Sequence, residues 1–152
     1  MQSDWKELIA SLKSHGVEFL IVDAHALAFH ARPRFTEDLD IYLRRSDENA
    51  KRLLAALNDF GLPVTKEAVQ HLMDAEREMM VLGREPVAVD LLNFLDGVEF
   101  DGAWSRRVTG DVLGESVFVI SIEDYVSTKK ACGRPKDLAD LALLGEVTGE
   151  TY

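Results

Sequence analysis

The sequence contains a single cysteine, Cys132, among its 152 residues. One thiol excludes an internal disulfide and a cysteine-rich zinc site. No apolar run approaches the roughly 20 residues that a membrane-spanning helix needs. The first residues, Met1 to Glu7, lack the basic and apolar regions of a signal peptide. These absences predict a cytoplasmic protein without a membrane segment.

Basic residues are also scarce, since 17 lysines and arginines stand against 27 aspartates and glutamates, and the net charge is −10. Such a surface repels phosphate backbones, so we expect no broad, sequence-independent binding of nucleic acid. A local basic patch could still hold one phosphate or one end of an RNA. With 47% hydrophobic residues the chain can bury a core, and its length fits one domain, residues 1–152.

Apolar periodicity and turn residues predict both helices and strands. We expect helices at residues 4–14, 24–30, 47–60, 65–73, from 121 onward and 135–147, with a short helix or loop in 96–106. We expect strands at residues 17–22, 38–43, 78–82 and 87–94, the last two around a turn at 83–86, and a hairpin of 108–113 with 116–120. Because several strands follow one another directly, the predicted fold class is α+β (mixed α/β), a mixed twisted sheet flanked by helices.

The stretch Asp38-Leu39-Asp40 opens a predicted strand and is the most informative part of the sequence. Alternate residues of a strand face the same side, with Cα atoms about 6–7 Å apart. Two carboxylates so placed repel each other unless a cation or strong donors lie between them. Mg²⁺ prefers oxygen ligands and shares them with substrate phosphates. An exposed strand face is the ordinary alternative, and the Asp-x-Asp spacing alone favours it.

Asp90 lies in the apolar segment Val87–Leu92, where a charge is costly without a partner. It could also be a paired structural carboxylate, or lie on the solvent face of its strand. Arg32 and Arg34 precede the acidic pair and could contact phosphate oxygens or only offset its charge. Upstream, near residues 22–26, a helix N-terminus could receive an anion. These neighbours favour one carboxylate site formed by the acidic pair together with Asp90.

Four segments of the chain carry a family pattern in their order and spacing. They are Phe19–His30 (FLIVDAHALAFH), Arg34–Ile41 (RFTEDLDI), Val89–Leu92 (VDLL) and Gly133–Leu141 (GRPKDLADL). They resemble, in turn, the opening, the paired carboxylates, the third-carboxylate strand and the closing tail of a minimal nucleotidyltransferase of the polymerase-β superfamily. The bacterial proteins grouped with abortive-infection and toxin nucleotidyltransferases are the most similar. The resemblance covers about residues 19–144 and implies a nucleotidyltransferase-like fold.

The activity that the resemblance implies is transfer of a nucleoside monophosphate from an NTP, such as ATP, to a hydroxyl acceptor. Asp38 and Asp40 would hold Mg²⁺, and Asp90 would hold a second ion or act as the base. Two cations would neutralise the phosphates and align the in-line attack. Lys129 and Arg134 are candidates for triphosphate contacts. The acceptor (RNA, a protein or a small molecule), the preferred base and a toxin–antitoxin role are left open.

One departure lies at Asp23-Ala24, where the family usually has Gly-Gly or Gly-Ser. Those glycines let the backbone approach the triphosphate, which then meets the helix N-terminus. Ala24 adds one methyl group, whereas a carboxylate at Asp23 would compete with phosphate for the same amides and repel it. Asp23 could instead face away as a helix cap. The alternative function is therefore a catalytically degenerate member that binds a nucleotide or a protein partner.

Other polar residues are weaker candidates. His25 and His30 are five residues apart and do not share one helical face well, so we expect no paired zinc site there. Cys132 lies beside basic residues that could lower the pKa of its thiol, although a packed cysteine without a role is more common. A basic cluster is either a solvated face or, if it lies near the carboxylates, a phosphate contact: Lys129, Lys130, Arg134 and Lys136.

Overall fold

The computed structural model describes residues 2–34, 36, 38–83 and 88–152, which form seven helices and a six-stranded sheet. The strands are β1 (Phe19–Val22), β2 (Asp38–Leu43), β3 (Met79–Leu82), β4 (Ala88–Leu92), β5 (Val108–Val112) and β6 (Glu115–Val119). The helices are α1 (Gln2–Ser14), α2 (Asp23–His30), α3 (Asp47–Phe60), α4 (Lys66–Asp74), α5 (Phe100–Ser105), α6 (Ile122–Cys132) and α7 (Pro135–Thr148). The predicted α+β class with a mixed twisted sheet is confirmed.

The sheet has the strand order β3-β4-β2-β1-β6-β5. β2 runs parallel to β4 and β1 runs parallel to β6, whereas the other adjacent pairs are antiparallel. β5 and β6 form the expected hairpin. β1 is buried at all four positions, which agrees with its continuous apolar sequence and its central place in the sheet. The edge strands β3 and β5, in contrast, each have several positions that are exposed or half-buried.

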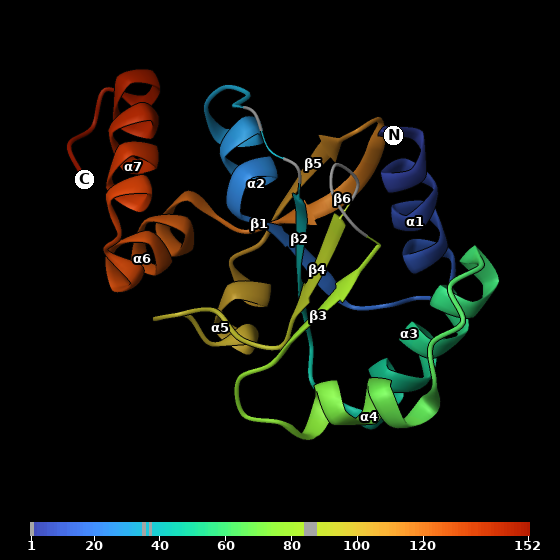
Figure 1. Cartoon of the computed structure of the whole chain (residues 1–152). Coiled ribbons are helices and arrows are strands. Elements are labelled where there is room, and N and C mark those ends of the chain that lie inside the picture. The colour runs from blue at the N-terminus through green and yellow to red at the C-terminus, as the bar shows by residue number, and fades with distance from the viewer. Residues whose placement is uncertain (1, 35, 37, 84–87) are drawn as a thin grey trace.

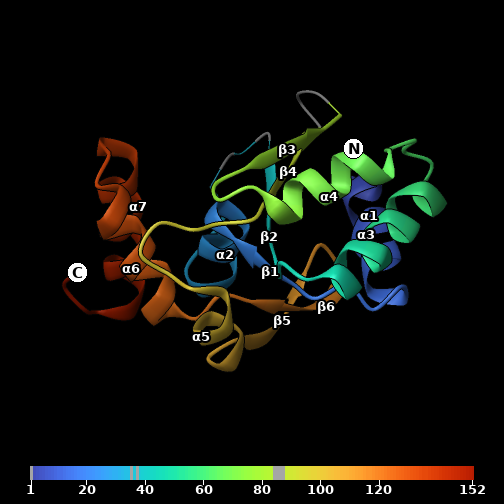
Figure 2. The ribbon, with the colours of Figure 1, turned by 90° about the horizontal axis from the view of Figure 1, so that it is seen from below.

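Helices cover the sheet in two groups. Figure 1 shows α1, α3 and α4 at one side of the molecule and α2, α6 and α7 at the other, and the view in Figure 2 keeps this division. The amphipathic helix α3 places Leu53 and Leu57 in the core, where neither is exposed to solvent. Among the described residues no helix is long and apolar enough to cross a bilayer.

Polar caps and glycines set the ends of several helices. The side chains of Ser46, Thr65 and Ser121 each accept a hydrogen bond from the backbone N–H three residues on, at the start of α3, α4 and α6. Gly61 and Gly133 adopt the left-handed conformation directly after α3 and α6. These local signals explain why the predicted bounds of the helices agree closely with the structure.

The differences from the predicted elements are small. The strand predicted to reach residue 94 ends at Leu92, because the side chain of Asn93 binds backbone groups of Leu72, Ala75 and Glu78 instead of continuing the strand. The helix predicted within 96–106 is α5. The turn predicted at 83–86 lies, apart from Gly83, outside the described residues, as do residues 35, 37 and 87.

Candidate functional site

The strand register brings the predicted carboxylates together. In the parallel pairing of β2 with β4, Asp40 and Asp90 are direct Cα partners, and Asp38 lies two residues earlier on β2. On the other side of β2, Val22 is the Cα partner of Asp40, so Asp23 follows at the same level of the sheet. Residues that are up to 67 positions apart in the sequence therefore meet at one place.

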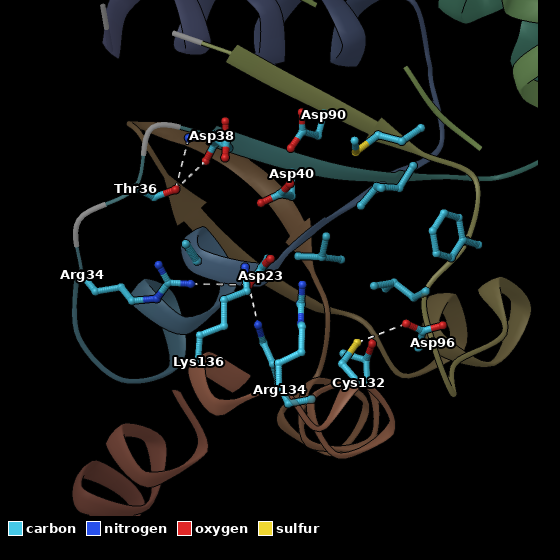
Figure 3. A pocket seen from close by; sticks show the side chains of 18 residues that line it. Asp23, Arg34, Thr36, Asp38, Asp40, Asp90, Asp96, Cys132, Arg134 and Lys136 are labelled. Atoms are coloured by element: carbon cyan, nitrogen blue, oxygen red, sulfur yellow. Dashed lines mark hydrogen bonds and ion pairs between the residues drawn. The ribbon is translucent and has the colours of Figure 1, made fainter. Parts of the chain in front are cut away.

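These carboxylates line a cavity of about 480 Å³ between the sheet and the helices α2 and α6. In Figure 3, Asp40 lies between the Asp38 and Asp90 side chains on one side and Asp23 on the other. Eight of the residues predicted to contact metal or nucleotide line this cavity: Asp23, Ala24, Arg34, Asp38, Asp40, Asp90, Lys129 and Arg134. The candidates Arg32 and Lys130 do not line it. Lys136 and Thr36 line it as well. The structure thus gathers these acidic and basic side chains around one cavity.

The Asp40 carboxyl group is electrostatically crowded. Its burial, the nearby charge of Asp23 and its interaction with Asp90 raise the pKa of Asp40 from 3.8 to about 8. A buried carboxylate that meets other carboxylates holds a proton unless a cation replaces it. The site therefore has the electrostatic character of a cation site, because a divalent ion would remove the repulsion that the proton now relieves.

The carboxylates of the cavity supply only some of the oxygen ligands that Mg²⁺ needs. Among the described residues no three His, Cys, Asp or Glu side chains converge closely enough to enclose a metal ion. Mg²⁺, however, keeps several water molecules and is commonly held by one or two carboxylates together with substrate phosphates. Asp40 and Asp90 supply such a pair, and Asp38 lies on the same strand as Asp40. The carboxylates are therefore compatible with an ion that arrives with a phosphate ligand.

Asp23 does not take the alternative position of a helix cap that faces away from the site. Val22 occupies the N-cap of α2, no side chain caps this helix, and Asp23 is its first residue with a φ of +56°. The Asp23 carboxylate lies 2.5 Å from Nζ of Lys129 and 3.6 Å from a terminal nitrogen of Arg34. The cap interpretation is wrong: Asp23 faces the basic residues of the cavity.

Lys129 is a buried cation surrounded by carboxylates. Its side chain is 4% exposed, and Nζ lies 3.2 Å from Asp137 and 3.3 Å from Asp140 in addition to its contact with Asp23. Burial lowers the pKa of Lys129, but the three carboxylates outweigh it and raise the pKa above its ordinary value. Lys129 is therefore charged and already paired, and it is not a freely available phosphate ligand.

The two predicted arginines are paired in the same cluster. Arg34 binds both carboxylate oxygens of Asp140, with Nε 2.9 Å and Nη2 3.1 Å away. Arg134 donates from Nε to Asp137 at 2.7 Å. Burial raises the pKa of Asp137, but the bonds from Arg134 and Lys129 outweigh it, so that the pKa falls from 3.8 to about 2. α2, α6 and α7 are thereby joined by ion pairs behind the cavity.

The two histidines and the cysteine are the weaker candidates of the sequence prediction. The Nε2 atom of His30 lies 2.6 Å from the carbonyl oxygen of Ile120, while the His25 ring packs edge-on against Trp5, so the histidines do not meet. The suggested lowering of the Cys132 pKa is wrong. Burial and a hydrogen bond to Asp96 raise the pKa of this thiol, because both disfavour the thiolate.

Asp137 and Asp140 are important residues of the cluster to which the sequence prediction assigned no role. They lie three residues apart in the motif GRPKDLADL, and Asp137 is the second residue after the proline that starts α7. Residues at this spacing share one face of a helix. Two aspartates on one face of a largely apolar helix indicate carboxylates with partners, and this spacing could have identified them from the sequence.

Comparison with known proteins was informative at the level of the family. A family model described as "Nucleotidyl transferase of unknown function (DUF2204)" matches residues 1–152. A comparison with curated proteins found no match. The matched range includes the carboxylate cavity and the ion cluster around Lys129.

Proposed function

Because the chain belongs to this family of nucleotidyl transferases of unknown function, we propose that it transfers a nucleoside monophosphate from an NTP to a hydroxyl acceptor in a Mg²⁺-dependent reaction. The observation that carries the proposal is the pairing of Asp40 with Asp90 across parallel strands, with Asp38 beside them, in a cavity that basic residues also line. This arrangement supports the proposal, because carboxylates suited to hold Mg²⁺ and basic side chains suited to contact phosphate surround one space.

Asp40 and Asp90 would hold the ion, with Asp38 as a further oxygen ligand. When bound, Mg²⁺ supplies positive charge that neutralises the phosphates and favours in-line displacement. The raised pKa of Asp40 supports this assignment, since a cation would take the place of the proton that the carboxyl group otherwise keeps. Thr36 supports the start of β2, because its hydroxyl accepts a hydrogen bond from the Asp38 amide at 3.1 Å.

In the proposed reaction the acceptor oxygen forms a bond to the α-phosphorus, and the bond from that phosphorus to the leaving pyrophosphate breaks. The acceptor proton passes to a carboxylate. Asp90 is our candidate for this base, in addition to its part in holding the ion. Lys136 and Arg134 line the cavity and are candidates for contacts with the leaving pyrophosphate. Arg134 already donates to Asp137, so its remaining N–H groups would make such contacts.

Titration calorimetry with each of the four NTPs in the presence of Mg²⁺ tests this proposal. We expect the wild type to bind at least one NTP only when Mg²⁺ is present, and Asp40→Asn to lose that binding. Asp111→Asn, at an exposed aspartate of β5, is the matched control and should bind like the wild type. Absence of NTP binding by the wild type would overturn the proposed activity.

The pairing of Asp23 with Lys129 favours a second function, that of a degenerate member which binds a nucleotide or a protein partner without catalysis. A carboxylate already occupies the neighbourhood of the buried cation. Pyrophosphate release separates the two functions, because a transferase releases it when given Mg²⁺, an NTP and an acceptor. NTP binding without release, across RNA, protein and small-molecule acceptors, would favour the degenerate member.

A further inference from the structure

The ion cluster behind the cavity balances its own charge. Lys129 is its centre, and each other member contacts Lys129 directly or through one residue. Among the residues that the structure describes, the cluster contains three cations and three carboxylates: Lys129, Arg34 and Arg134, and Asp23, Asp137 and Asp140. A cluster with equal numbers of opposite charges has no excess positive charge with which to attract a phosphate.

Asp23 is the carboxylate of this cluster that lines the cavity. Its side chain is 29% exposed, whereas the Asp137 and Asp140 side chains are 0% and 8% exposed. Its backbone has a φ of +56°, a conformation that favours glycine and is strained for most other residues. The strained backbone nevertheless directs the carboxylate toward Lys129. Removal of Asp23 would therefore alter the cavity side of the cluster and leave the two deeper ion pairs of Lys129 in place.

The opposite wall of the cavity is also acidic, since it carries Asp38, Asp40 and Asp90. A phosphate that entered without a cation would meet these carboxylates on one side and Asp23 on the other. Like charges at such short range repel strongly in a partly buried site. A phosphate that carries divalent ions would not be repelled in this way, because the positive charge of the ions would offset the carboxylates on both walls.

We propose that Asp23 is a specificity-determining residue that restricts the cavity to metal-complexed phosphates by balancing the positive charge of the ion cluster around Lys129. The ligand class is a nucleoside triphosphate or other polyphosphate bearing divalent cations, and the excluded class is the same anion free of metal. This inference rests on the proposed function. It deepens that function by assigning the metal requirement to a residue outside the metal ligands.

Calorimetric titration with tripolyphosphate in EDTA tests the proposal. Asn tolerates the left-handed backbone and keeps the size of the side chain. Asp23→Asn removes one negative charge and leaves Lys129 bound to Asp137 and Asp140. We expect the wild type to bind tripolyphosphate only when Mg²⁺ is present, and Asp23→Asn to bind it in EDTA with an affinity at least roughly tenfold higher than the wild type.

Asp96→Asn is the matched control, because Asp96 lines the same cavity and does not contact Lys129. It should bind tripolyphosphate in EDTA no better than the wild type. An equal gain in this control would overturn the proposal, since it would assign the effect to overall charge. Unchanged binding by Asp23→Asn would overturn it as well.

A second variant, Asp23→Gly, keeps the test decisive if the asparagine variant folds poorly, because glycine adopts a φ of +56° without strain. It should show the same gain in EDTA. The outcome is separable from that of the proposed function. Failure of the wild type to bind Mg²⁺-NTP would refute the transferase, whereas unchanged exclusion of metal-free tripolyphosphate after removal of Asp23 would refute the role of Asp23.

Discussion

Asp137 provides a quantitative test of the ion cluster. Its pKa is about 2 in the folded protein against an ordinary value of 3.8. Because each unit of pKa difference corresponds to about 1.4 kcal/mol, the charged Asp137 stabilises the folded state by about 2 kcal/mol at pH 7. The folded pKa is lowered, so this stability is present above pH 3.8 and is lost as the pH falls toward 2. We expect Asp137→Asn to be less stable than the wild type by about 2 kcal/mol at pH 7 and by about 1 kcal/mol at pH 3.

Urea unfolding followed by tryptophan fluorescence measures this difference, because Trp5 is buried in the core and becomes exposed on unfolding. The titration should be carried out at several pH values between 7 and 3. Glu7→Gln, at an exposed position of α1, serves as the control for loss of one acidic charge. A gap between Asp137→Asn and the wild type that stays constant from pH 7 to pH 3 would refute the reasoning, and so would a gap below about 0.5 kcal/mol at pH 7.

Three further predictions concern the site and the core. In EDTA at pH 8, Asp40→Asn should have a melting temperature ~2 °C or more above that of the wild type. Because the pKa of Asp40 is raised, the folded wild type loses stability as the pH rises from about 4 to 8, and the asparagine variant does not. An unchanged melting temperature would contradict this prediction. Gly110→Ala should destabilise by about 1–3 kcal/mol in urea unfolding, since its Cβ would lie 2.3 Å from the Phe29 ring. Gly102→Ala, which meets only the flexible end of an arginine, should have little effect. Asn93→Ala should lower stability by about 2–4 kcal/mol in the same assay, because three backbone groups lose their buried partner.

Much of the fold could be predicted from local signals in the sequence. The predicted strand at residues 38–43 and helix at 47–60 coincide with β2 and α3. Ser46 and Gly61 mark the two ends of that helix through hydrogen bonding and backbone conformation, which depend on neighbouring residues only. The strand order and the direct pairing of Asp40 with Asp90 could not be derived in this way, because they depend on contacts between residues 50 positions apart.

In the candidate site, too, some features could be predicted from the sequence and others depend on how distant segments pack. The three carboxylates were predicted as one site, with Arg34, Lys129 and Arg134 as candidate phosphate contacts, and the structure gathers these residues around one cavity. The partners of Lys129 could not be predicted, since they come from two other helices, α2 and α7, and depend on how these pack against α6. The direction of Asp23 was equally open, because a carboxylate at the start of a helix can cap the helix or face a neighbouring cation.

Electron paramagnetic resonance with Mn²⁺ as a substitute for Mg²⁺ tests most directly whether the carboxylate site holds a divalent cation together with a triphosphate. Mn²⁺ would be titrated into the protein with and without an NTP. We expect wild-type binding that strengthens when the NTP is present, and a loss of at least roughly tenfold in Asp40→Asn and in Asp90→Asn. Equal Mn²⁺ affinity in the wild type and both variants, with the NTP present, would contradict the assignment of the metal site.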